Sequence, residues 1–269
     1  MLYCTIHRKM MTMRILCIGD VVGSAGCEFL RSHLPSFKKL HKVDLTVCNG
    51  ENSADGNGIT PRSADHLFTS GVDVITLGNH SFRRPEVYSY LDEKPYIIRP
   101  MNFPHPQTPG NGMCTVDMGY TQVTVINLMG QEAIDNHLDN PFLAIERLLP
   151  KLDSKIVLLD FHAEPTSEKR AMGLFLDGKV SAVFGTHTHV MTADAEVLPG
   201  GTGYITDLGM TGAIDSVLGV KKDIIINRFL TRLPARFEYE KSACKMNCTL
   251  FEIDNASGKC LSATSYELR

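Results

Sequence analysis

Six short apolar runs, each followed by polar residues, most constrain what this chain can fold into. They are RILCIGD (14–20), DLTVCNGEN (44–52), DVITLGNH (73–80), VTVINLMG (123–130), KIVLLDFHAE (155–164) and VSAVFGTHTH (180–189). Continuous aliphatic runs of this length are typical of strands that are buried on both faces, as in parallel sheets covered by helices. The runs therefore predict an α/β fold.

Helical patterns lie between most of these runs, as in CEFLRSHLPSFKKL (27–40) and NPFLAIERLLPKL (140–152). In the second, Asn140 is a suitable N-cap and Pro141 suits the first turn. Beyond about residue 195 the pattern changes to shorter strand candidates, which predict an antiparallel end to the fold. These candidates are ARFEYE (235–240), CTLFEID (248–254) and SATSYEL (262–268).

The division of the chain follows from the same patterns. No linker, low-complexity tract or internal repeat divides it, so a single domain over residues 13–269 is predicted. Residues 1–12 precede the first convincing strand and contain Met10 and Met11, close to Met13. We interpret this segment as a leader outside the domain.

Composition narrows the class of protein. Across 269 residues the hydrophobic content is 43% and the formal net charge is −3, so bulk charge gives no reason to expect binding to nucleic acid. The sequence shows no signal peptide and no apolar stretch long enough to span a membrane. Eight dispersed cysteines without paired CxxC spacing predict reduced thiols and a cytoplasmic protein. Cys244 and Cys248, the nearest approach to a ligand pair, are interpreted as structural.

Potential metal ligands follow the predicted strands. They are Asp20, Glu51 with Asn52, Asn79 with His80, His162, and His187 with His189. In open α/β sheets, sites are built outside the carboxyl ends of the strands, so these side chains are expected to meet. Singly, each also fits a helix cap, a turn or a core histidine. Together, carboxylate, amide and imidazole ligands favour a pair of first-row metal ions.

The segment GTHTHV (185–190) carries two of these ligands. If it is extended, the side chains of His187 and His189 point the same way and can converge on one metal or one phosphate.

Several motifs, in this order, resemble those of the calcineurin-like metallophosphoesterases, and most closely their bacterial YmdB-like branch. They are GDVVG, NGEN, GNH, DFHAEPTSEK and GTHTHV, together with RPMNFP (99–104), YITDLGMTG (204–212) and LPARF (233–237). The resemblance covers the chain from about Arg14 to the C-terminal strands. It implies an α/β/β/α sandwich, in which two mixed sheets are flanked by helices.

The resemblance also implies roles for individual residues. One metal would be held by Asp20, Asn52 and His189, and a second by Asn79, His162 and His187. Glu51 would bridge the two metals. His80 would stay off the metals and act as the general acid.

Two positions depart from the wider pattern. Val22 stands where the superfamily usually has a histidine after Asp20, and the YmdB-like pattern uses Asn52 instead. Phe82 and Arg83 stand where relatives carry a tryptophan and an acidic residue. Arg83 therefore has two open interpretations, as a phosphate contact or as a solvated side chain.

Residues around the ligands have candidate supporting roles. Asp160, Glu164 and Asp207 are candidates for fixing the tautomers of histidine ligands. The loop with Thr206, Asp207 and Thr211 either orients substrate or is a plain turn.

The resemblance implies a metal-dependent phosphodiesterase acting on small phosphodiesters, with 2′,3′-cyclic nucleotides as the indicated substrates. Attack by a hydroxide bridging two metals would break the ester. Iron or manganese is favoured, with zinc and cobalt left open. Oligomeric state, including a homo-oligomer, also stays open.

Three alternatives remain. A phosphomonoesterase or nucleotidase could use the same metal pair, and a regulatory protein could bind metal without catalysis. A dinucleotide-binding module is suggested by Gly19, Gly23 and Gly26, but their spacing is not GxGxxG.

Overall fold

Each of the six apolar runs forms a strand in the computed structural model, which describes residues 12–134 and 137–269. These strands are β1 (Thr12–Ile18), β3 (Leu45–Asn49), β4 (Val74–Thr76), β7 (Gln122–Met129), β8 (Ile156–His162) and β9 (Ala182–Thr186). Residues 1–11 of the predicted leader lie outside the described residues. β1 begins at Thr12, one residue before the predicted start of the domain at residue 13. The interpretation of residues 1–11 as a leader stays a prediction.

The strands form two mixed sheets. The larger has the order β2-β12-β13-β1-β3-β4-β5, with β14 paired to β13, and the smaller has the order β10-β11-β9-β8-β7-β6. The remaining strands are β2 (Asp20–Val21), β5 (Ile97–Ile98), β6 (Met113–Asp117), β10 (Glu196–Val197), β11 (Gly203–Ile205), β12 (Met210–Ala213), β13 (Cys244–Asp254) and β14 (Cys260–Leu268). Neighbours among β1, β3, β4 and β5 are parallel, as are neighbours among β7, β8, β9 and β11.

The C-terminal part is antiparallel, as predicted, with one correction. β13 pairs antiparallel with both β1 and β14. The segment 235–240, however, forms no strand and contributes only an isolated bridge between Val220 and Tyr239. Pro234 and the charged residues Arg236, Glu238, Glu240 and Lys241 leave too few apolar positions to bury a strand there.

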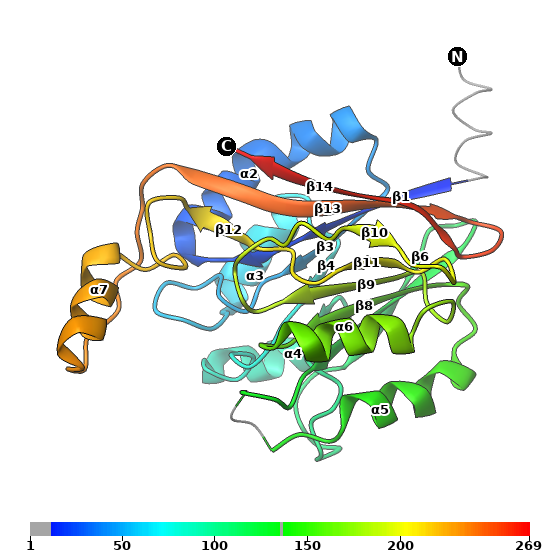
Figure 1. Cartoon of the computed structure of the whole chain (residues 1–269), viewed down its shortest axis with the longest axis horizontal. Coiled ribbons are helices and arrows are strands. Elements are labelled where there is room, and N and C mark those ends of the chain that lie inside the picture. The colour runs from blue at the N-terminus through cyan, green and yellow to red at the C-terminus, as the bar shows by residue number, and fades with distance from the viewer. Residues whose placement is uncertain (1–11, 135–136) are drawn as a thin grey trace.

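The helices are α2 (Gly23–His41), α3 (Pro61–Thr69), α4 (Tyr88–Glu93), α5 (Pro141–Leu148), α6 (Thr166–Phe175) and α7 (Lys222–Thr231), with short 3-10 turns η1 (Pro85–Val87) and η2 (Leu149–Lys151). Asn140 caps α5 as predicted, because its side chain accepts hydrogen bonds from the backbone N–H groups of Phe142 and Leu143. In Figure 1, α2 and α6 lie on opposite sides of the stacked sheets, and α7 projects from the rest of the chain.

Three apolar layers hold this arrangement together. Alternate residues of β1 face opposite ways, so Ile15 packs between the sheets while Leu16 packs against the helices of the larger sheet. A third cluster, including Leu159 and Met172, joins the smaller sheet to α5 and α6. The predicted α/β/β/α sandwich is therefore confirmed.

The described helices include none that is both long and apolar enough to cross a bilayer. The seven cysteines among the described residues are free thiols, in agreement with the prediction for them.

Candidate metal centre

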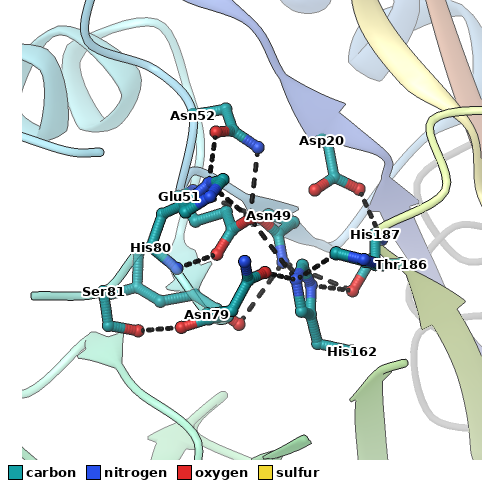
Figure 2. Close-up of polar contacts among 12 residues, drawn as sticks. Asp20, Asn49, Glu51, Asn52, Asn79, His80, Ser81, His162, Thr186 and His187 are labelled. Atoms are coloured by element: carbon teal, nitrogen blue, oxygen red, sulfur yellow. Dashed lines mark hydrogen bonds and ion pairs between the residues drawn. The ribbon is translucent and has the colours of Figure 1, made fainter. Parts of the chain in front are cut away.

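All seven predicted metal ligands, together with His80, lie at one place along the carboxyl ends of the parallel strands. Asp20 follows β1, Glu51 and Asn52 follow β3, Asn79 and His80 follow β4, His162 ends β8, and His187 and His189 follow β9. Figure 2 shows most of these side chains converging from both sheets. Asp20, Glu51 and His162 are no more than 1% exposed, so the centre is largely shielded from solvent.

One group of potential ligands surrounds His162. Its Nε2 lies 2.9 Å from Asn79 Oδ1, 3.0 Å from His187 Nδ1 and 3.3 Å from Glu51 Oε1. Glu51, His162 and His187 each offer a ligand atom within 4.8 Å of the other two. These side chains are close enough together to hold one metal ion.

A second group surrounds His189. Its Nε2 lies 3.3 Å from Asn52 Nδ2 and 3.6 Å from Asp20 Oδ1. Asn52 Nδ2 in turn lies 3.1 Å from Glu51 Oε1, the same oxygen that approaches His162. The two groups therefore meet at one carboxylate oxygen of Glu51.

The geometry of GTHTHV differs from the expectation of an extended segment. β9 ends at Thr186, and both His187 and His189 have positive φ angles, of 100° and 63°. Non-glycine residues adopt this region rarely and at a cost in energy. The segment is therefore not extended beyond Thr186, and the two imidazoles lie in different ligand groups, His187 beside His162 and His189 beside Asp20.

Electrostatics in the centre favour ionised carboxylates. Burial opposes the charge on Asp20 and Glu51, but attraction and hydrogen bonds to histidines together outweigh it and lower both pKa values, chiefly through His189 for Asp20 and His162 for Glu51. Burial also opposes protonation of His162, yet the attraction of Glu51 raises its pKa to about 9. Burial and repulsion from His162 lower the pKa of His187 to about 3. These pKa values favour a protonated His162 beside a neutral His187, and a metal ion would compete with the Nε2 proton of His162.

His162 is held from behind by a hydrogen-bond chain that sequence reasoning only half identified. Its Nδ1 donates to Thr186 Oγ1 over 2.9 Å, and Thr186 donates to Asp160 Oδ1 over 2.6 Å. Thr76 donates to the other oxygen of Asp160, and Asn49 Nδ2 lies 3.3 Å from it. Asp160 was a candidate for this role, whereas Thr186, Thr76 and Asn49 were missed.

The other two candidate supports also have partners in the centre. Glu164 lies 2.9 Å from His187 Nε2. Asp207 accepts a hydrogen bond from the backbone N–H of Thr188, between the two histidines, and pairs with Lys169 at 2.5 Å. Lys169 and Asp207 are each 1% exposed at the side chain, so this ion pair is a buried support of the loop.

His80 is placed beside the ligands rather than among the two groups. Its backbone N–H donates to Glu51 Oε2 at 2.8 Å, and its Nδ1 lies 2.9 Å from Asn52 Oδ1. The Nε2 atom lies 3.3 Å from Asn57 Nδ2. The ring is 21% exposed, so it remains accessible from the pocket.

Within the part of the chain that the structure describes, two buried polar atoms in the centre lack hydrogen bonds, as expected of metal ligands. Asp20 Oδ1 and His189 Nδ1 are buried without a hydrogen-bond partner among the described residues. An oxygen of a buried, ionised carboxylate that accepts no hydrogen bond is costly unless a cation satisfies it. Asn52 fits a metal site only if its amide is turned round. Amides bind metals through oxygen, whereas here the Nδ2 atom of Asn52 faces His189.

A pocket of about 310 Å³ opens onto these side chains. It is lined by Val22, Glu51, Asn52, Asn57, His80, Glu164, His187, Thr188, His189, Leu218, Val220, Phe237 and Tyr239. Arg83 is exposed and does not line it, whereas Arg84 donates to the backbone carbonyls of Asp55 and Asn57. Thr206 and Thr211 are buried away from it, so the loop that carries them supports the centre through Asp207.

The glycines behind the dinucleotide alternative have a packing role. A Cβ at Gly19 would stand 2.2 Å from the carbonyl oxygen of Gly209, and one at Gly26 2.4 Å from that of Thr211. These glycines are required where backbone segments approach closely, which explains them without a bound pyrophosphate.

This chain is similar to proteins of one family over most of its length. A family model described as "YmdB-like protein" matches residues 16–265. The 2′,3′-cyclic-nucleotide 2′-phosphodiesterase of Bacillus subtilis (strain 168) is 44% identical over 249 residues, covering 92% of this chain and 94% of that protein.

Two crystal structures are also similar. A phosphatase from Mycoplasma pneumoniae has a TM-score of 0.92 at 32% identity, with 96% of this chain and 94% of that chain covered. A hypothetical protein from Thermus thermophilus has a TM-score of 0.89 at 40% identity, with 96% and 100% covered.

Proposed function

Because the chain belongs to the YmdB-like family, within the calcineurin-like metallophosphoesterases, we propose that it hydrolyses 2′,3′-cyclic nucleotides with two metal ions. The broader class, a phosphoric diester hydrolase, follows from its relatives. The observation that carries the proposal is the position of Glu51 Oε1, which lies 3.3 Å from His162 Nε2 and 3.1 Å from Asn52 Nδ2. One carboxylate oxygen thus touches both ligand groups.

We divide the ligands between the two ions as the family resemblance implies. Asp20, Asn52 and His189 would hold one ion, Asn79, His162 and His187 the other, and Glu51 would contact both. Two bound metal ions supply an activated water nucleophile and neutralise charge on the phosphoryl oxygens. Mixed nitrogen and oxygen donors suit iron or manganese, and also zinc or cobalt.

His80 is the chain's own candidate for the proton transfer. It is tethered on one side by Asn52 and Glu51, so its Nε2 faces Asn57 and the pocket. With the amide of Asn52 reversed for metal binding, Asn52 Nδ2 would donate to His80 Nδ1. Nε2 would then be the ring nitrogen from which His80 passes a proton to the leaving oxygen.

The substrate class comes from the Bacillus subtilis relative, whose activity is on 2′,3′-cyclic nucleotides. A pocket of about 310 Å³ beside the ligands lies at the lower end of the usual range for small-molecule sites. A phosphomonoesterase remains the second candidate, because the similar Mycoplasma pneumoniae structure is that of a phosphatase.

Metal content and substrate preference together test the proposal. Purified protein supplied with manganese or iron is analysed for metal, and turnover of 2′,3′-cyclic AMP and of adenosine monophosphates is compared before and after chelation. We expect two ions per chain and chelator-sensitive opening of the cyclic ester. Cleavage of the monoesters alone would favour the phosphatase, and full activity in metal-free protein would refute the metal mechanism.

A further inference from the structure

The wall of the pocket that faces the ligands is apolar and aromatic. Leu218, Val220, Phe237 and Tyr239 line the same pocket as Glu51, His80 and His189. Leu218, Val220 and Phe237 can neither ligate a metal nor transfer a proton, and the reaction proposed above uses Tyr239 for neither. Their presence beside a phosphate-cleaving centre calls for another role.

Local backbone pairing presents two of these side chains together. The backbone N–H of Lys221 donates to Glu238 O at 2.9 Å, and that of Glu240 donates to Gly219 O at 2.8 Å. Side chains alternate along such an extended segment, so Phe237 and Tyr239 share one side. Glu238 takes the other side, where it pairs with Lys221 at 2.8 Å.

The two rings are held, yet neither is fully covered. The guanidinium of Arg228 lies 5.2 Å from the ring centroid of Phe237, which still leaves that residue 43% exposed. Tyr239 packs against two glycines, where a Cβ at Gly23 would stand 3.6 Å from its Cγ and one at Gly219 3.7 Å from its Cδ1. Aromatic rings that are fixed by their neighbours and partly exposed to the pocket are suited to stacking against a flat ligand.

We propose that Phe237 and Tyr239 form the wall that binds the base of the nucleotide. This inference rests on the proposed function, because it names the part of the substrate that the metal ligands do not contact. Every base has a flat π face, so stacking tolerates all of them and gains most from the larger purines. Asn57 and Thr188, at the polar edge of the pocket, are placed for hydrogen bonds to the ribose or base.

The test compares two five-membered cyclic phosphodiesters, one with a base and one without. 2′,3′-Cyclic AMP and glycerol 1,2-cyclic phosphate are assayed with the metal-loaded wild-type protein and with Phe237→Ala. Because stacking is worth about 1–3 kcal/mol per base, KM for cyclic AMP should rise about 5- to 150-fold. We expect kcat/KM for glycerol cyclic phosphate to stay unchanged and Phe237→Tyr to restore the wild-type KM for cyclic AMP.

Two further variants control for indirect effects. Tyr120→Ala removes a 44% exposed ring from the turn between β6 and β7. This turn leads into the N-terminal end of β7, whereas the metal centre lies at the carboxyl ends of the parallel strands. Leu230→Ala removes a 78% exposed side chain from α7, the helix that precedes the aromatic segment. Neither should change KM for either substrate.

Equilibrium binding separates failure of this inference from failure of the proposed function. Adenosine 3′-monophosphate, the product of opening the ring at the 2′ oxygen, is titrated into wild type and Phe237→Ala by calorimetry. Weaker binding to the variant supports the base wall even if no diester is cleaved. Equal binding, or equal losses of kcat/KM on both cyclic esters, overturns it.

Discussion

His162 and Thr186 share a hydrogen bond of 2.9 Å, from ring Nδ1 to the threonine hydroxyl, at the buried end of the metal centre. Thr186 must use its own proton for Asp160, so it can only accept from His162. Nδ1 therefore carries a proton, and Nε2, which faces Asn79, Glu51 and His187, is the nitrogen that would give up its proton to bind a metal ion.

Removing that acceptor should weaken metal binding. Thr186→Val keeps the volume but leaves His162 Nδ1 without its partner, and loss of such a support typically costs about 10- to 100-fold in metal affinity. The affinity is measured by calorimetric titration of manganese into metal-free protein.

The matched control is Thr124→Val, also a buried threonine of the smaller sheet, which bonds to Thr115 and Ser154 instead. It should leave metal affinity unchanged. Equal affinity in both variants would mean that Thr186 does not set the tautomer of His162.

The two histidines of GTHTHV should be separable by mutation. His187 lies with His162 and Asn79, whereas His189 lies with Asp20 and Asn52, so each substitution by alanine disrupts a different ion. We expect each variant to retain about one metal per chain where the wild type retains two, since one complete group survives. Elemental analysis after dialysis measures this, and loss of both ions in both variants would indicate a single shared site.

The strands and the convergence of the candidate ligands could be predicted from the sequence because their signals are local. Aliphatic runs mark buried strands whatever their partners are, and polar residues directly after them reach one edge because parallel strands end together. Asp20 and His162 were found in this way from opposite sheets of the sandwich. The division of ligands between two ions came from the family resemblance.

The features of the site that the sequence did not predict depend on backbone angles and on residues far apart in the chain. Nothing in GTHTHV indicates that His187 and His189 take positive φ, because these angles are set where the chain leaves β9. Asn49 stands in NGEN, next to predicted ligands, but its contact with Asp160 is made across 111 residues. Phe237 reaches the pocket because its segment pairs with residues near Gly219, and the strand-like pattern of ARFEYE does not reveal that partner.

Replacing His80 should separate metal binding from catalysis. His80→Ala removes the proposed proton donor but none of the seven ligands, so metal content should match the wild type. General acid catalysis typically contributes about 10²–10⁴-fold, so kcat for 2′,3′-cyclic AMP should fall by that order. Elemental analysis of the same preparation is the control. Loss of metal from the variant would indicate that His80 is a ligand, and an unchanged kcat would exclude His80 as the general acid.

Replacing Lys169 should destabilise the fold through Asp207. Lys169→Met leaves the Asp207 carboxylate buried without its partner at 2.5 Å, and breaking such a pair typically costs about 3–5 kcal/mol in the free energy of unfolding. Burial raises the pKa of Asp207 and the charge of Lys169 opposes that rise, so the variant should have a still higher pKa. A carboxyl whose folded pKa lies above its unfolded value loses stability as the pH rises toward the folded pKa.

The deficit of Lys169→Met should therefore be larger at pH 8 than at pH 5, as measured by urea unfolding of metal-free protein. Arg170→Met is the matched control on the next residue, because its pair with Glu196 is 41% and 42% exposed. Exposed pairs contribute about 0–1 kcal/mol, so this variant should unfold close to the wild type at both pH values. If the two variants lost the same stability, or if the Lys169→Met deficit did not grow with pH, the buried pair would not be what supports the loop between His187 and His189.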